Sequence, residues 1–126
     1  MKAPRLIMIA VLLAGTVGCA GRGELDTVDY VDLERFMGDW YVIAHIPVFI
    51  ERNAYNAIES YELDGERIET TFTFRNKSFT GPEKRYEPNA IVRDSESNAV
   101  WGMQFIWPFR ADFRIVHLDE DYATTI

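Results

Sequence analysis

The chain has 126 residues, of which 48% are hydrophobic and 13% aromatic, enough to build the core of one domain. Its formal net charge of −7 argues against a surface that binds nucleic acid or anionic lipid headgroups. A single cysteine leaves no partner for an internal disulfide.

The first segment, residues 1–18, has the three-part plan of a bacterial export signal. Lys2 and Arg5 give it a positive start, an almost wholly apolar stretch follows, and small residues end it. The apolar stretch is shorter than the roughly 20 residues that span a bilayer. We therefore expect this signal to be removed and residues 28–126 to form the folded domain.

The surroundings of Cys19 bear on whether the leader is a lipoprotein signal or a plain secretory signal. Thr16-Val17-Gly18-Cys19 resembles a bacterial lipobox, in which lipid is attached to the cysteine and cleavage occurs just before it. The alternative is a plain secretory signal with an incidental cysteine. A lipobox implies an acylated Cys19, and several acyl chains anchor firmly because each buried CH₂ contributes about 0.8 kcal/mol. By resemblance to lipoprotein sorting rules, Ala20 implies the outer membrane, and residues 19–27 form a tether.

After the tether the pattern predicts one or two helical turns and then successive strands. Asp32 is placed to cap the helical segment and Gly38 to end it. Alternation is clearest where Ile68, Thr70 and every second residue after them share one face. We expect strands over 40–46, 55–63, 67–75, 86–93, 99–106 and 113–118, with a last one starting at Tyr122.

Two kinds of connection alternate along these strands. Those at 64–66, 94–98 and 119–121 are short and polar, whereas the other three are long and carry large apolar residues. In an up-and-down antiparallel meander, alternate connections lie at the same end. We therefore expect a closed end with Trp40 and an apolar mouth that covers a pocket, touches a membrane or packs back on the wall. The mouth residues are Phe49, Phe79, Trp107 and Phe109.

The run Gly38-Asp39-Trp40-Tyr41 resembles the first signature of the lipocalins, Gly-x-Trp-Tyr, and Asp121-Tyr122 matches part of the second. Together with the lipobox and the runs at 49–52, 107–109 and 115–119, the chain resembles the bacterial outer-membrane lipoprotein lipocalins, relatives of apolipoprotein D. This resemblance implies an all-β fold, an up-and-down antiparallel barrel, with a short N-terminal helical turn.

The family barrel has eight strands followed by a helix, and about seven strands can be counted here. The closing strand, the helix and an arginine that crosses Trp40 have no counterpart before Ile126. We interpret the sequence as incomplete at its C-terminus. If it is a true short product, its unpaired edge strands favour pairing with a second copy, as in a homodimer.

The resemblance implies a small lipid ligand, a fatty acid or lysophospholipid, and a role in membrane maintenance under stress. An apolar cavity with a few polar points suits such a ligand, although the same side chains can also simply fill a small barrel. Alternation turns these residues inward: Val42, Ala44, Tyr61, Phe72, Phe74, Trp101, Met103 and Phe105.

Glu59 shares the inner face of its strand with Tyr61. There its carboxylate suits a cationic headgroup such as choline or ethanolamine. The alternative is that Glu59 lies at the wet mouth or is turned outward by a bulge.

Two other classes of protein are alternatives to a lipid carrier. An enzyme is not expected, because the chain has no Gly-x-Ser-x-Gly elbow, and His45 and His117 stand alone in separate strands without a ligand cluster. Each histidine is a candidate haem ligand or base but fits an ordinary strand residue better, so no cofactor or metal is expected. A structural envelope lipoprotein that binds protein partners remains the alternative to a lipid carrier.

Overall fold

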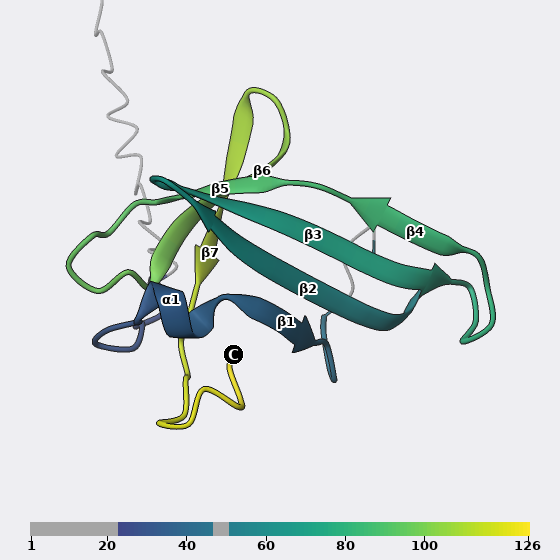
Figure 1. Ribbon diagram of the computed structural model, residues 1–126, viewed down its shortest axis with the longest axis horizontal. Coiled ribbons are helices and arrows are strands. Elements are labelled where there is room, and N and C mark those ends of the chain that lie inside the picture. The colour runs from purple at the N-terminus through teal and green to yellow at the C-terminus, as the bar shows by residue number, and fades with distance from the viewer. Residues whose placement is uncertain (1–22, 47–50) are drawn as a thin grey trace, which may run out of the picture.

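The computed structural model describes residues 23–46 and 51–126. One antiparallel sheet holds all seven strands in the order β1-β2-β3-β5-β6-β7, with β4 pairing the other part of β3. The sheet curves strongly around its inner face (Figure 1). The elements are α1 (Leu33–Phe36), β1 (Gly38–Tyr41), β2 (Ala54–Asp64), β3 (Arg67–Asn76), β4 (Glu83–Tyr86), β5 (Asn89–Val92), β6 (Val100–Ile106) and β7 (Phe109–Arg114).

The all-β, up-and-down architecture is confirmed, with each strand antiparallel to its neighbour and one short helix before the sheet. Asp32 caps α1 as expected, accepting a hydrogen bond from the backbone N–H of Arg35 at 3.3 Å. Gly38 then begins β1 with a φ of 108°, a conformation that favours glycine. Within the described residues no ladder joins β1 to β7.

The hairpin of β2 and β3 follows the sequence prediction most closely. Asp64 pairs with Arg67 across a two-residue turn, and Gly65 has a φ of 62° there. Every second residue from Ile68 to Phe74 is buried, as the alternation predicts. A bulge shifts the register between Tyr55 and Ile58, which leaves the faces from Ala57 onward as expected.

Two predicted strands differ from the observed ones. The strand expected over 40–46 stops at Tyr41, and the one expected over 86–93 is split into β4 and β5 at Glu87-Pro88. Pro88 has no N–H for the ladder, so the pairing with β3 breaks there, although the N–H of Thr70 still donates to the Pro88 carbonyl at 3.0 Å.

The prediction of a long loop over 107–112 and a strand over 113–118 is wrong. Ile106 pairs with Phe109 across the turn Trp107-Pro108, so β7 starts at Phe109. The large apolar residues at 107–109 were interpreted as part of a long loop, whereas they form the tip of a tight hairpin. The strand expected from Tyr122 is also absent from the described residues, where a single bridge joins Leu118 to Thr125.

Buried side chains form two groups on the inner face. The first, here called the main core, comprises Val31, Phe36, Tyr61, Ile68, Ala90, Ala99, Trp101, Met103 and Ile115. The second, here called the small cluster, comprises Ala57, Phe72 and Phe74, with Val42 and Ala54 packed against it.

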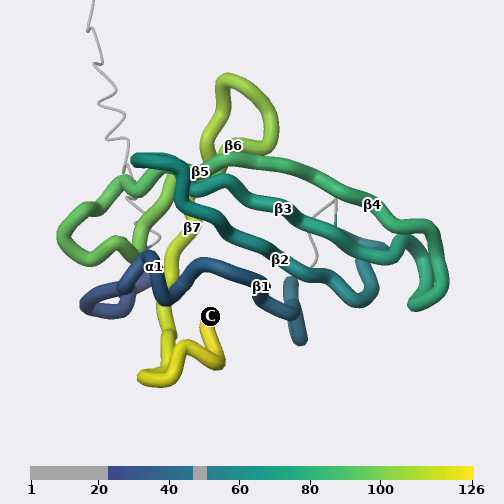
Figure 2. Tube along the Cα trace, in the orientation of Figure 1, coloured from purple at the N-terminus to yellow at the C-terminus, as the bar shows by residue number. Residues whose placement is uncertain are grey.

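The main core lies at the end of the sheet that holds the short polar turns. Leu63, Ala99 and Leu118, which flank the three turns, all pack into this core, and so does Trp40. The C-terminal segment passes close to α1 (Figure 2), where the N–H of Asp32 donates to the Tyr122 hydroxyl at 2.9 Å. The expected closed end is therefore present.

Candidate ligand-binding site

The main core is filled by interlocking aromatic rings. Trp101 is 0% exposed and stacks on Phe113 at 5.0 Å between centroids. Its ring meets the rings of Phe36 and Tyr61 edge-on at 5.4 and 5.5 Å. Of the predicted lining, Tyr61, Trp101 and Met103 belong to this core. These contacts leave the core no room for a ligand beside Trp101.

Trp40 closes the same end. Its indole stacks on Phe36 with centroids 4.8 Å apart, and its Nε1–H donates to the Phe36 carbonyl at 2.8 Å. Both polar and apolar parts of the ring are thus satisfied inside the protein. Trp40 acts as a structural plug here.

The other signature residues also have structural positions. Tyr122 lies beneath the guanidinium of Arg35, 4.0 Å from the ring centroid, and this contact ties the C-terminal turn to α1. Tyr41 and Asp121 are exposed.

The small cluster contains fewer buried side chains than the main core, although Ala57, Phe72 and Phe74 are themselves only 4–6% exposed. Phe72 and Phe74 lie 5.3 Å apart, and Tyr86 of β4 stacks on Phe74 at 6.1 Å. Beside them lies a depression of about 320 Å³, close to the lower limit for small-molecule sites. Its lining is Val42, Ile43, His45, Ala54, Tyr55, Asn56, Ala57 and Phe79.

Glu59 lies between the main core and the small cluster. In the register of the sheet it is opposite Trp40 on β1 and Phe72 on β3. The Tyr61 hydroxyl donates a hydrogen bond to the Glu59 carboxylate. The carboxylate is half-buried on the inner face, so the bulge in β2 does not turn it outward.

Burial determines the ionisation of this pair. Desolvation raises the pKa of Glu59, against the lowering effect of the hydrogen bond from Tyr61, and the charge of Glu51 raises it further. Burial and the adjacent Glu59 charge raise the pKa of Tyr61 well above its usual value. Tyr61 therefore keeps its proton and continues to donate it.

Thr70 is a polar residue of the inner face that the lining prediction omitted. It is 4% exposed, lies opposite Tyr61 in the sheet, and its Oγ1 has no hydrogen-bond partner among residues 23–46 and 51–126. The sequence held a signal for it: Thr70 is the one hydroxyl residue on the otherwise apolar face that runs from Ile68 to Phe74.

Two predicted lining residues are exposed. Ala44 lies beyond the end of β1 and is exposed. Phe105 is 50% exposed. Its strand outruns its neighbour, because the pairing of β5 with β6 ends at Gln104, and a register shift follows Met103. The prediction from alternation holds only where a strand has a paired neighbour on both sides, and at Phe105 the neighbour β5 has already ended.

The predicted mouth residues differ in their surroundings. Phe79 meets Tyr55 edge-on at 5.0 Å, whereas Trp107 and Phe109, at the tip of the β6–β7 hairpin, are 82% and 75% exposed. This hairpin projects from the sheet in Figure 1. Trp107 and Phe109 therefore do not pack back against the wall of the sheet, which was one of the three expectations for the mouth residues. Phe49 and the predicted lipidation site Cys19 lie outside the described residues.

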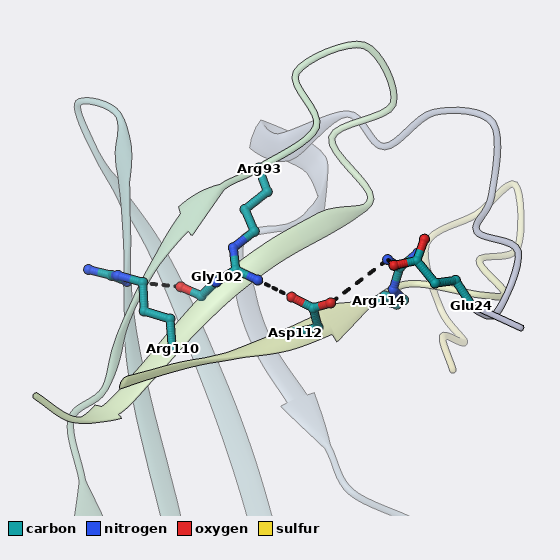
Figure 3. A network of polar contacts seen from close by, with 6 residues as sticks. All are labelled: Glu24, Arg93, Gly102, Arg110, Asp112 and Arg114. Atoms are coloured by element: carbon teal, nitrogen blue, oxygen red, sulfur yellow. Dashed lines mark hydrogen bonds and ion pairs between the residues drawn. The ribbon is translucent and has the colours of Figure 1, made fainter. Parts of the chain in front are cut away.

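The outer face of β6 and β7 is polar. Figure 3 shows Asp112 between Arg93 and Arg114, with Glu24 on the far side of Arg114 at 3.0 Å. Arg93 lies close over Gly102, where an added Cβ would be 2.7 Å from its Nε. These charged side chains make the outer face unsuitable for an apolar ligand, so the inner face is the candidate site.

The described part of the chain contains no cluster of three His, Cys, Asp or Glu residues that suits a metal ion. His45 and His117 are both exposed. No helix within residues 23–46 and 51–126 has the length and hydropathy to cross a membrane.

Comparison with known proteins agrees with this architecture. Residues 31–126 match the family model described as a lipocalin-like domain. The chain is also 27% identical over 101 residues to a protein of Acanthamoeba polyphaga mimivirus that bears the name "Putative lipocalin R877". That match covers 76% of this chain and 59% of the viral protein. The strand order, the filled end around Trp40 and the match over residues 31–126 lead to one conclusion: the chain belongs to the lipocalin family.

Proposed function

We propose that the protein binds a small lipid, a fatty acid or a lysophospholipid, and stores or carries it for membrane maintenance. The observation that supports this most is the small cluster: an apolar surface on the inner face, beside a depression of about 320 Å³, in a chain of the lipocalin family. Lipocalins in general bind or transport small hydrophobic molecules, and an acyl chain fits a surface of this kind.

The proposal includes attachment to the outer membrane through an acylated Cys19. Its support is the sequence: a positive start, an apolar stretch and the lipobox-like run at Thr16–Cys19. Palmitate labelling of cells that express the natural protein or Cys19→Ser tests this part. Label that is lost in the variant supports the anchor, and label that survives the substitution refutes it.

A protein-binding role is the second candidate function. It is favoured by the exposed Ile106, Trp107 and Phe109 at the β6–β7 hairpin, since large exposed apolar residues that lie together mark interaction sites.

Mass spectrometry of lipid extracted from the purified native protein separates the two functions. Stoichiometric lipid supports the carrier. Its absence, together with no binding of added fatty acid or lysophospholipid, favours the partner-binding role.

A further inference from the structure

Three polar side chains interrupt the apolar inner face on the neighbouring strands β2 and β3. They are Glu59, Tyr61 and Thr70, here called the polar band. Along β2, Tyr61 belongs to the main core and Ala57 to the small cluster, with Glu59 between them. Along β3, Thr70 likewise lies between Ile68 of the core and Phe72 of the cluster. Glu59 and Thr70 therefore lie between the main core and the small cluster, and Tyr61, which is opposite Thr70, is the part of the band that belongs to the core.

Two features show that the band is not satisfied by the protein alone. The Thr70 hydroxyl is buried and has no partner among the described residues, which is an unfavourable state for a buried polar atom. Among the described residues, the half-buried Glu59 carboxylate receives one side-chain hydrogen bond, from Tyr61, although a carboxylate has about four acceptor sites. Buried polar groups left in this state are costly unless a bound molecule completes them.

The chemistry of the band is that of an acceptor. Tyr61 donates its only hydroxyl proton to Glu59, so its oxygen remains as an acceptor. Glu59 in its ionised form donates nothing and carries negative charge. Thr70 alone is able to donate. A carboxylate or phosphate end placed here would meet the like charge of Glu59 and the acceptor oxygen of Tyr61, with Thr70 as its single donor.

We propose that the polar band holds a hydrogen-bond-donating, non-anionic end of the ligand, a hydroxyl or a protonated amine, while its apolar chain lies along the small cluster. This inference rests on the proposed function and narrows its substrate class. It places the polar end inside the fold next to Trp40, and it excludes free fatty acids from this orientation.

Four probes of equal chain length test the inference: dodecylamine, dodecanol, dodecanoate and dodecane. Each is titrated into the full-length protein at about pH 8, where the amine and the carboxylate are both charged, and followed by tryptophan fluorescence. We expect the amine and the alcohol to bind at least about tenfold more tightly than dodecanoate, because the Glu59 charge repels an anion and Thr70 is the band's single donor.

The variants Glu59→Gln and Thr70→Val remove the two unsatisfied groups at nearly constant size. We expect Glu59→Gln to reduce the preference for dodecylamine over dodecanoate about tenfold. Thr70→Val should lower the affinity for dodecanol. The affinity for dodecane should stay unchanged in both variants. Glu62→Gln and Thr71→Val are matched controls, because these neighbours lie on the opposite faces of the same strands. If Glu59→Gln does not fold, Thr70→Val and the wild-type ranking still decide.

Each outcome has one meaning. If the protein prefers dodecylamine and dodecanol, and Glu59→Gln and Thr70→Val reduce this preference, the polar band is supported. Comparison of the amine with the alcohol then distinguishes attraction by charge from hydrogen bonding. Equal binding of all four probes, unaffected by the variants, overturns the polar band but leaves the lipid carrier standing. If no probe binds and the native protein carries no lipid, the proposed function fails and the inference fails with it.

Discussion

The main core and the small cluster lie on the same inner face of one sheet, yet their side chains are packed in different ways. Around Trp101, rings from α1, β1, β2 and β7 meet at centroid distances of 4.8–6.2 Å. The small cluster has three buried members and borders a depression. The difference shows that packing is unequal along one sheet: aromatic rings fill one end, whereas the other has a smaller cluster that borders a depression.

The largest expected effect comes from Trp101→Ala. Removing a fully buried indole should lower the free energy of unfolding by about 3–5 kcal/mol, because its aromatic neighbours cannot collapse into the space. Urea denaturation measures this. Phe74→Ala is the matched substitution in the small cluster. It should lower the free energy of unfolding by about 3 kcal/mol or less, since fewer side chains surround Phe74. An equal or larger loss for Phe74→Ala would remove the contrast between the two ends.

A turn beyond the small cluster provides the next test. In Gly81→Ala the added Cβ would overlap the backbone carbonyl of Asn76, so the turn between β3 and β4 must move. We expect a loss of about 1–3 kcal/mol in thermal or urea unfolding. Gly65→Ala, in the turn next to the main core, has open space but a φ of 62°, and should cost about 1–2 kcal/mol. No loss in Gly81→Ala would show that this turn is loose in solution.

The boundary between the two regions should respond to pH through Glu59. Its pKa is raised in the folded protein above the ordinary value of 4.5, so the native state holds this proton more firmly than the unfolded state. The contribution of Glu59 to stability is therefore fully present below about pH 4.5 and lost as pH rises through the raised pKa. Relative to Glu59→Gln, the natural protein should become less stable with rising pH.

Unfolding of both proteins in urea across this pH range measures the difference. The exposed Glu62→Gln is the matched control on the opposite face of β2. A difference between natural protein and Glu59→Gln that stays constant with pH would contradict the burial of this carboxylate.

The smallest effect is expected at the β6–β7 hairpin. Trp107 is 82% exposed, so Trp107→Ser should change the free energy of unfolding by no more than about 0.5 kcal/mol. Urea unfolding followed by circular dichroism avoids the loss of the tryptophan signal. A loss as large as that of Phe74→Ala would mean that this indole is covered in solution.

Prediction from sequence succeeded where the signal was local. Alternation over 67–75 identified the buried face of β3, and the cap at Asp32 and the turn at Gly65 were found from residue type alone. It failed where an element depends on its neighbour. The length of β5 decides that Phe105 is exposed, and the pairing of Ile106 with Phe109 converts an expected loop into a hairpin.

The candidate site shows the same division. Val42, Phe72 and Phe74 were placed on the inner face from sequence and do line the small cluster. Alternation did not reveal that Tyr61, Trp101 and Met103 fill a core. That distinction depends on which side chains face them from other strands. Thr70 was left out of the lining because a threonine in a strand is ordinary until its burial, and its lack of a partner among residues 23–46 and 51–126, are known.

By itself, the sequence determined the all-β class, the lipocalin signature at Gly38–Tyr41 and the faces of β2 and β3, because successive side chains of a strand point to opposite sides. Only the tertiary structure decided that the Trp40 indole bonds to the Phe36 carbonyl, that Tyr122 docks on α1, and that Tyr61 lies opposite Thr70. These relations depend on the register between strands far apart in the chain, which no local periodicity encodes.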